Sequence, residues 1–153
     1  MHIEEIEHAI GALIGKSYRS LSTLLQRNFK EAGCEISIDQ WVVLVGLYKN
    51  DGSTQQELSV FCRKDKSSTA RIIAGLEQKK LLLRKTDRND KRNKRVFLTK
   101  TAKDLQQKLL DQVDKTIQTA LKGQNEEDIE TCKNVLRTVM INSNNALNLE
   151  TTE

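Results

Sequence analysis

The sequence contains no proline, and only seven of its 153 residues are glycine. These two residues disfavour helix interiors most strongly, so their scarcity predicts a chain built largely of helices. The three cysteines, Cys34, Cys62 and Cys132, are odd in number and widely spaced, and they form no CxxC pair. This pattern argues against a disulfide framework and against a zinc site, so we expect no bound metal.

Signatures of catalysis are also missing from the sequence. The only histidines, His2 and His8, lie in the first ten residues, and there is no HExxH, P-loop or dinucleotide fingerprint. We therefore expect neither enzymatic activity nor a cofactor. The longest apolar run, Trp41 to Tyr48, is too short to cross a bilayer, and the acidic N-terminus does not resemble a secretory signal. We expect a cytoplasmic protein with no membrane association.

The charged residues are unevenly distributed along the chain, although the formal net charge is only +4. Residues 61–100 contain fourteen Lys or Arg and four Asp or Glu, a net charge of +10, so the remainder carries −6. An acidic body with one strongly basic segment is typical of proteins that bind a polyanion. The alternative, a solvated charge run, predicts mixed signs and no adjoining helix-turn-helix pattern, and this segment shows neither.

Part of the basic segment is predicted to form a β-hairpin. Seven of the sixteen residues from Arg84 to Thr99 are Lys or Arg. The β-prone runs Leu81–Leu83 and Val96–Thr99 bracket them, which predicts two strands joined by a basic turn. A basic hairpin directly after a helix is the element with which a winged helix contacts DNA.

A predicted helix-turn-helix precedes this hairpin. Thr54 and Glu57 have the spacing of a capping box, which predicts the start of a short helix. After a basic turn, Asp65 can cap a second helix that runs from Lys66 to about Lys80. Its apolar residues form one face, and the opposite face contains Ser67, Ser68, Arg71, Gly75 and Gln78. Two short helices joined by a tight turn, the second with a polar and basic face, predict a helix-turn-helix.

Amphipathic helices are predicted on both sides of this segment, because apolar residues recur there every three to four positions. The other predicted helices run from Ile3 to a stop at Gly33, from Ser37 or Asp39 to about Tyr48, over Thr101–Leu121, and from Glu126 to about Leu147. Apolar residues make up only 37% of the chain. Long helices that bury themselves against a partner chain would explain this low value.

Three motifs resemble those of the multiple-antibiotic-resistance regulator (MarR) family. They are Thr54-x-x-Glu57-Leu58 at the first helix, Asp65–Arg71 followed by Leu76-Glu77 at the recognition helix, and Asp87-x-x-Asp90-Lys91-Arg92 with Leu98-Thr99 at the wing. Each motif alone is weak, but the three occur in the family's order and at its separations. The chain departs from the family at Lys80, where glycine is usual, at Ala102, where glycine is frequent, and at Lys91, which replaces an arginine.

The resemblance implies a mostly α-helical winged helix-turn-helix fold with about six helices and a short β-hairpin wing. It implies one domain over residues 1–153, with a DNA-binding lobe at about 37–100 and dimerisation helices at 1–33 and 101–149. A homodimer would place two recognition helices in successive major grooves, so the resemblance also implies a pseudo-palindromic operator in double-stranded DNA. The expected function is transcriptional regulation, with repression favoured over activation and release of DNA by a small molecule as a further feature.

The helix-turn-helix and the wing supply the candidate DNA-binding residues. These are Thr54, Gln55, Lys64, Lys66, Ser67, Ser68, Arg71, Arg84, Arg88, Asp90, Lys91, Arg92, Lys94 and Arg95. Arg71 is long enough to reach guanine in the major groove, although it could instead bind phosphate. Arg92 is placed by resemblance at the wing tip, where it would enter the minor groove with Asp90 holding its guanidinium.

Two further sites are raised by the sequence and the resemblance. Family members bind small aromatic acids and other ligands between the dimer base and the DNA-binding lobe, which makes Trp41, Tyr18 and Arg19 candidates for an aromatic or phenolic ligand. Burial in the core is the favoured alternative for Trp41. The basic neighbours of Cys62 could activate its thiol for redox sensing, but a packed, unreactive side chain is again favoured. A winged helix that binds protein instead of DNA remains the other class of function.

Overall fold

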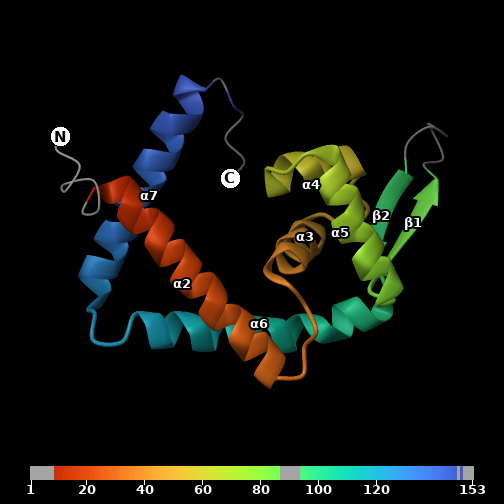
Figure 1. The fold of residues 1–153 in the computed structure, drawn as a ribbon, viewed down its shortest axis with the longest axis horizontal. Coiled ribbons are helices and arrows are strands. Elements are labelled where there is room, and N and C mark those ends of the chain that lie inside the picture. The colour runs from red at the N-terminus through yellow and green to blue at the C-terminus, as the bar shows by residue number, and fades with distance from the viewer. Residues whose placement is uncertain (1–8, 87–93, 148, 150–153) are drawn as a thin grey trace. The chain divides into compact units, whose positions relative to one another are not determined.

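The computed structural model describes residues 9–86, 94–147 and 149, and it confirms the predicted fold class. Six helices and a two-stranded antiparallel hairpin occur in these residues (Figure 1). In chain order they are α2 (Ile10–Glu31), α3 (Ile38–Lys49), α4 (Gln55–Cys62), α5 (Lys66–Gln78), β1 (Leu82–Thr86), β2 (Lys94–Leu98), α6 (Lys100–Ala120) and α7 (Glu126–Ala146). The predicted first residues of the N-terminal helix lie outside the described part of the chain.

Side-chain caps define where helices α3, α4 and α5 begin. The predicted capping box before α4 is confirmed, because the Thr54 hydroxyl accepts from the Glu57 amide and the Glu57 carboxylate accepts from the Thr54 amide. Asp65 accepts from the Ser68 amide at 2.8 Å and caps α5 as predicted. A second capping box, formed by Ser37 and Gln40 before α3, was missed by the sequence analysis.

The hairpin is larger than the two predicted strands. Leu82 pairs with Leu98 and Thr86 with Lys94 in an antiparallel register. Residues 52–54 extend the sheet along the other edge of β2: Gly52 donates to the Val96 carbonyl, Val96 donates to Ser53, and Thr54 forms a bridge with Arg95. The α3–α4 connection is thereby fixed to the wing.

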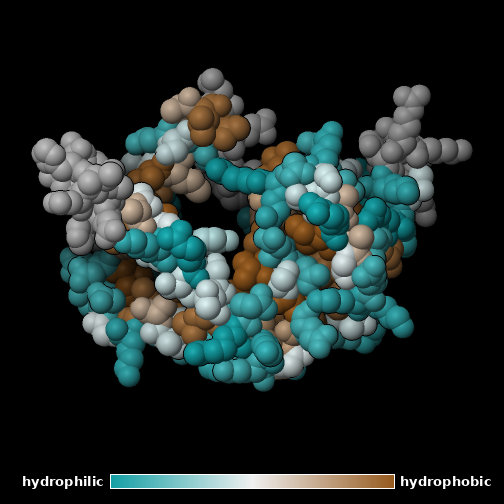
Figure 2. All heavy atoms as spheres, viewed as in Figure 1, coloured by the Kyte–Doolittle hydropathy of each residue, from teal (hydrophilic) through white to brown (hydrophobic). Residues whose placement is uncertain are grey.

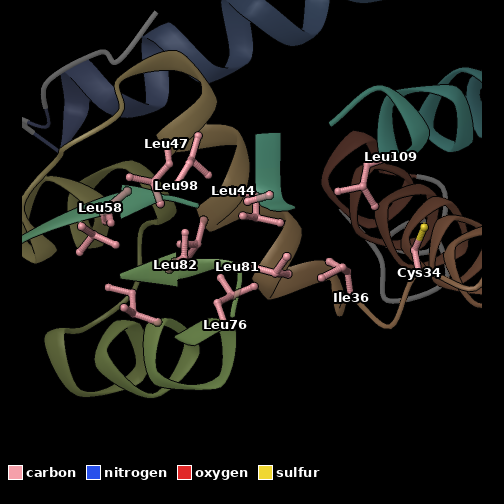
Figure 3. Close-up of a cluster of buried hydrophobic side chains, with 14 of the residues drawn as sticks. Cys34, Ile36, Leu44, Leu47, Leu58, Leu76, Leu81, Leu82, Leu98 and Leu109 are labelled. Atoms are coloured by element: carbon pink, nitrogen blue, oxygen red, sulfur yellow. The ribbon is translucent and has the colours of Figure 1, made fainter. Parts of the chain in front are cut away.

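The core of the lobe is made of leucines from five different elements. Figure 3 shows Leu47, Leu58, Leu76, Leu82 and Leu98 pointing toward one another from α3, α4, α5, β1 and β2. All five are buried, and Leu47, Leu58 and Leu76 are at most 1% exposed. Burying a leucine contributes about 1.5–3 kcal/mol, so this cluster holds the two helices of the helix-turn-helix and the wing together.

A second part of the core joins α2, α3 and α6. Phe29 is fully buried and meets the edge of Trp41 at 5.8 Å between ring centroids. The Tyr48 hydroxyl donates to the Ala102 carbonyl at 2.8 Å, and burial raises the pKa of Tyr48 to about 12. This phenol therefore stays protonated at neutral pH and remains a donor between α3 and α6.

A buried polar pair also connects α2 to α6. The Asn28 amide donates to the Thr116 hydroxyl at 2.8 Å, and that hydroxyl donates to the Gln112 carbonyl. Both Asn28 and Thr116 are almost completely buried. A buried amide needs a partner, so this hydrogen bond favours one register of the two helices over others.

The chain divides into two compact units, residues 1–116 and residues 117–153, with the division inside α6. The second unit contains α7, on which many large apolar side chains are exposed (brown in Figure 2). Those on the second unit are Ile117, Leu121, Val135, Leu136, Met140, Ile141, Leu147 and Leu149. No helix in the described ranges is both long enough and apolar enough to span a membrane.

Candidate nucleic-acid interface

The recognition helix α5 presents a polar face whose central side chains are exposed. Thr69, Ile73 and Leu76 are fully buried on its other side, which leaves Lys66, Ser67 and Arg71 in solvent. Among the described residues none pairs with the charged groups of Lys66 and Arg71. These two cations are therefore available for a ligand.

Three other polar candidates use their side chains to hold the helix-turn-helix together. The Ser68 hydroxyl donates to the Asp65 carboxylate at 2.7 Å, and the Thr54 hydroxyl donates to Glu57 at 3.0 Å. The Gln55 amide donates to the Lys66 carbonyl at 3.3 Å and so connects the start of α4 to the start of α5. The hydroxyls of Ser68 and Thr54 are thus already used as donors within the protein.

The cap on α5 has an electrostatic consequence. The Ser68 side-chain and backbone hydrogen bonds lower the pKa of the exposed Asp65 carboxyl. A carboxylate at a helix N-terminus also interacts favourably with the helix dipole. Asp65 therefore stays charged at neutral pH, close to the exposed end of the recognition helix.

Two of the predicted DNA-contacting cations form ion pairs between elements. Lys64, in the turn before α5, lies 3.1 Å from the Asp39 carboxylate of α3. Arg84 of β1 lies 3.0 Å from Glu77 of α5, and both side chains are about 70% buried, with exposures of 27% and 30%. The Arg84 pair therefore fixes the wing to the recognition helix, which is a structural role that the sequence did not suggest.

The wing strands carry exposed basic side chains, and contacts with the α3–α4 connection hold the strands in position. The Arg95 guanidinium donates to the Gly52 carbonyl at 2.9 Å. Asp51 accepts from the Leu98 amide at 2.8 Å and lies 2.8 Å from the Lys103 ammonium of α6. Lys94 is exposed at the start of β2. Arg88, Asp90, Lys91 and Arg92, which were predicted to form the wing tip, lie outside the described residues.

One basic residue, Lys80, occupies a strained turn. Its φ angle is +57°, in the left-handed region that favours glycine. This is the position at which the family resemblance predicts glycine, and the geometry gives the reason, because the chain must reverse between α5 and β1. The Lys80 carbonyl accepts from the Thr99 hydroxyl across the base of the hairpin.

The three ligand candidates do not come together in one site. Trp41 packs between Phe29 and Tyr48 as part of the core, while Tyr18 is 61% exposed on α2. Arg19 lines an open hollow of about 430 Å³ on α2, whose other walls are Ser20, Thr23, Leu24 and Arg27. The described part of the chain contains no group of three His, Cys, Asp or Glu that could hold a metal ion.

Cys62 does not have the properties of a reactive thiol. Burial raises its pKa to about 11, and the opposing effect of Lys64 is smaller than that of burial. At neutral pH the thiol is almost entirely protonated, whereas the thiolate is the reactive form. The basic neighbours in the sequence therefore do not activate Cys62, and it packs against the core instead.

Comparisons with known proteins agree with this architecture. The profile of the MarR family matches residues 36–94. The uncharacterized HTH-type transcriptional regulator YybA of Bacillus subtilis (strain 168) is 28% identical over 129 residues, which cover 84% of this chain and 85% of that protein. These similarities include the helix-turn-helix and the first part of the wing.

Solved structures extend the similarity to the terminal helices. A MarR transcriptional regulator from Methanosarcina mazei Go1 is 27% identical, with a TM-score of 0.80 over 88% of this chain and 95% of that chain. BpsR of Bordetella bronchiseptica, whose DNA binding is regulated by 6-hydroxynicotinic acid, shares the fold at 20% identity, with a TM-score of 0.80 over 92% and 96%. The motifs, the winged helix-turn-helix and these matches together show that the chain is similar, in sequence and in fold, to transcriptional regulators of the MarR family.

Proposed function

We propose that this regulator binds a pseudo-palindromic operator in double-stranded DNA as a homodimer and represses transcription in the cytoplasm. The observation that carries the proposal is the exposed face of α5, where Lys66 and Arg71 have no charged partner among the described residues. The rest of the helix is fixed by its cap, by the leucine core and by the Glu77–Arg84 pair. A rigid helix with free cations suits insertion into the major groove.

The two kinds of basic residue on this face have different proposed roles. Arg71 reaches base edges and favours guanine, Arg92 enters the minor groove, and Lys66, Lys94 and the other wing-tip cations bind phosphate. Other polar residues are already paired within the protein and hold the interface elements in position. They include Lys64, Arg84 and Ser68. Ser67 is the exposed hydroxyl that can still donate to DNA.

Dimerisation is supported by the apolar side chains that stay exposed on the terminal helices. Leu136 and Met140 are each 42% exposed, and they lie one helical turn apart on α7. A second copy of the chain would bury them. A two-fold dimer presents two recognition helices, which is why the proposed operator is pseudo-palindromic.

A small aromatic acid is the proposed effector class, by analogy with the regulation of BpsR by 6-hydroxynicotinic acid. The hollow on α2 is lined by Arg19 and Arg27, and a guanidinium group can pair with a carboxylate. Binding of the acid should weaken the affinity for the operator. It should also slow hydrogen exchange of the backbone amides near Arg19. Absence of both effects across a panel of aromatic acids would remove this part of the proposal.

Selection of bound DNA from a random pool tests the main proposal. We expect a recovered site with two-fold symmetry, bound less tightly at high salt. Arg71→Ala should cost about 1–3 kcal/mol on that site and relax preference at one or two base pairs of each half-site. Arg92→Ala should instead weaken binding to many sequences and make the salt dependence shallower, by roughly one unit of slope per phosphate charge lost in each protomer.

The alternative function, a winged helix that binds protein, gives the opposite results. Selection would then recover no preferred sequence, and neither arginine variant would alter DNA binding. If Arg92→Ala binds every site like the parent, the wing does not contact DNA. Selection also reveals the symmetry and half-site spacing on which the regulated genes can be searched.

A further inference from the structure

One short segment, residues 35–40 at the start of α3, contacts the helix-turn-helix at two separate places. At the turn before the recognition helix, Asp39 pairs with Lys64 at 3.1 Å. Beyond the other end of that helix, the Lys79 ammonium donates to the Glu35 carbonyl and, at 3.0 Å, to the Gln40 amide oxygen. The same segment is therefore attached near both ends of α5.

Gln40 also lies close to α5 one turn before Lys79, at Gly75. Gly75, predicted from the sequence to lie on the exposed face, instead approaches Gln40, so that a Cβ there would be 3.1 Å from the Gln40 Nε2 atom. Gln40 also accepts from the Ser37 amide in the capping box of α3. The Gln40 side chain thus caps the start of α3 and also accepts a hydrogen bond from the Lys79 ammonium.

On its other side, the segment is hydrogen-bonded to the side chain of Gln26 on α2. The Gln26 amide donates to the Ile36 carbonyl at 2.8 Å, and its oxygen accepts from the Ile38 amide at 3.1 Å. Gln26 therefore contacts the backbone on both sides of Ser37 and is partly buried there. These contacts form a continuous polar path from α2 through residues 35–40 to Lys79.

We infer that Gln26 and Lys79 are positioning residues that set where the recognition helix stands relative to α2. This inference rests on the proposed function, in which the terminal helices form the dimer. The path would then fix the separation of the two recognition helices, and with it the half-site spacing that the dimer accepts. Lys79 lies just after the recognition helix and is basic, but its ammonium is used within the protein rather than for phosphate.

The physical reason is preorganisation. A recognition helix free to tilt must be ordered when it binds, and that ordering reduces affinity. Both sets of contacts are exposed or partly buried, so each contributes a modest amount to stability. Their loss should therefore leave the fold intact while broadening the positions that α5 samples. The measurable result is poorer discrimination between operators of different spacing.

The test compares Lys79→Met with the parent on the selected operator and on versions with one base pair inserted or deleted between the half-sites. We expect affinity for the native spacing to fall roughly threefold to tenfold. Affinity for the altered spacings should fall less, so the spacing ratio decreases. The slope of affinity against salt should stay that of the parent, and Lys79→Arg should restore the ratio.

Two matched lysine variants separate the explanations. Lys66→Met removes a proposed phosphate contact and should lower the salt slope by about two per dimer without changing the spacing ratio. Lys108→Met removes an exposed lysine of α6 and should change neither quantity. If the slope of Lys79→Met falls like that of Lys66→Met, Lys79 contacts phosphate and the inference is wrong.

A double-variant cycle tests whether Gln26 and Lys79 act through the same segment. Gln26→Met should also reduce the spacing ratio, and the double variant should lose no more than the larger single loss, because the links are in series. Independent, multiplicative losses would overturn the inference. If the parent binds no specific site, the proposed function fails first; if the parent binds and Lys79→Met keeps its spacing ratio, this inference alone fails.

Discussion

The helix-turn-helix lobe and the C-terminal helix use apolar residues in opposite ways. In the lobe, Leu58 and Leu76 are at most 1% exposed, and each faces leucines from other elements. In α7, the apolar residues Val135, Leu136 and Met140 are 42–46% exposed, and the only buried residue of the helix is Asn144. The lobe completes its core within one chain, whereas α7 presents an apolar stripe that one chain leaves in water.

This difference is consistent with the proposed function, in which a rigid DNA-binding lobe is combined with terminal helices that form the dimer. The lobe needs fixed side chains because its recognition helix must keep its position. In the proposed dimer, the terminal helices offer an apolar surface that a second copy would cover. Variants of each region should therefore affect different measurements, one the stability of the lobe and the other the dependence on protein concentration.

The largest expected effect comes from charging the α7 stripe. Leu136→Glu combined with Met140→Glu should convert the proposed dimer to monomer at micromolar concentration. Each buried apolar side chain contributes about 1.5–3 kcal/mol, and two-fold symmetry doubles the loss. Sedimentation velocity measures the change, with Gln107→Glu on α6 as a control. A variant that remains dimeric would show that α7 is not part of the interface.

A core variant of the lobe should act on stability. Leu58→Ala should lower the free energy of unfolding by about 2–5 kcal/mol, because it leaves a cavity among tightly packed leucines. Val60→Ala is the matched control on the same helix, where the side chain is 49% exposed, and it should change stability by at most about 0.5 kcal/mol. Denaturant unfolding measures both variants. Equal losses would contradict the contrast between buried and exposed positions.

A smaller effect is expected from relieving strain at the turn into the wing. Lys80→Gly should raise stability by up to about 1 kcal/mol, because glycine adopts the left-handed conformation of this residue without the steric penalty of a Cβ. The greater freedom of glycine in the unfolded chain offsets part of this gain. Thermal unfolding provides the measurement. A clear loss of stability would show that the Lys80 side chain contributes more than its strain costs.

The smallest effect should depend on pH. The pKa of Asp65 is lowered in the folded protein, so its charged form stabilises the fold above the ordinary carboxyl pKa. That contribution is lost as the pH falls through the lowered, folded-state pKa. Asp65→Asn keeps a capping oxygen but cannot titrate. Its stability should fall below that of the parent at neutral pH and approach the parent in acid; a constant difference would contradict the titration.

Sequence reasoning succeeded where contacts are local. The Thr54–Glu57 capping box, the Asp65 cap and the stop at Gly33 each involve residues within a few positions of one another, so their spacing is visible in the chain. The Ser37–Gln40 box has the same kind of spacing and could have been found by the same rule. The basic content of the hairpin was likewise evident from composition alone.

Sequence reasoning could not distinguish cations that face solvent from cations that bind the protein. Lys64 and Arg84 look like further members of a basic DNA-binding segment, but their partners are Asp39 and Glu77 on other helices. Which acid approaches which base depends on helix packing. The pKa of Cys62 also depends on helix packing. Burial by neighbouring elements raises this pKa by more than the basic residue Lys64 lowers it.

The sequence by itself determined the helix order, the caps of α4 and α5, the basic character of the hairpin and the resemblance to a family, because these depend on local spacing and composition. Only the tertiary structure decided which basic residues remain available on the recognition face and which hold it in place. It also showed how Gln26, Gln40 and Lys79 connect α2 to the end of α5. The two contacts of Lys79 join residues 39 and 44 positions apart, and their geometry exists only once the core has packed.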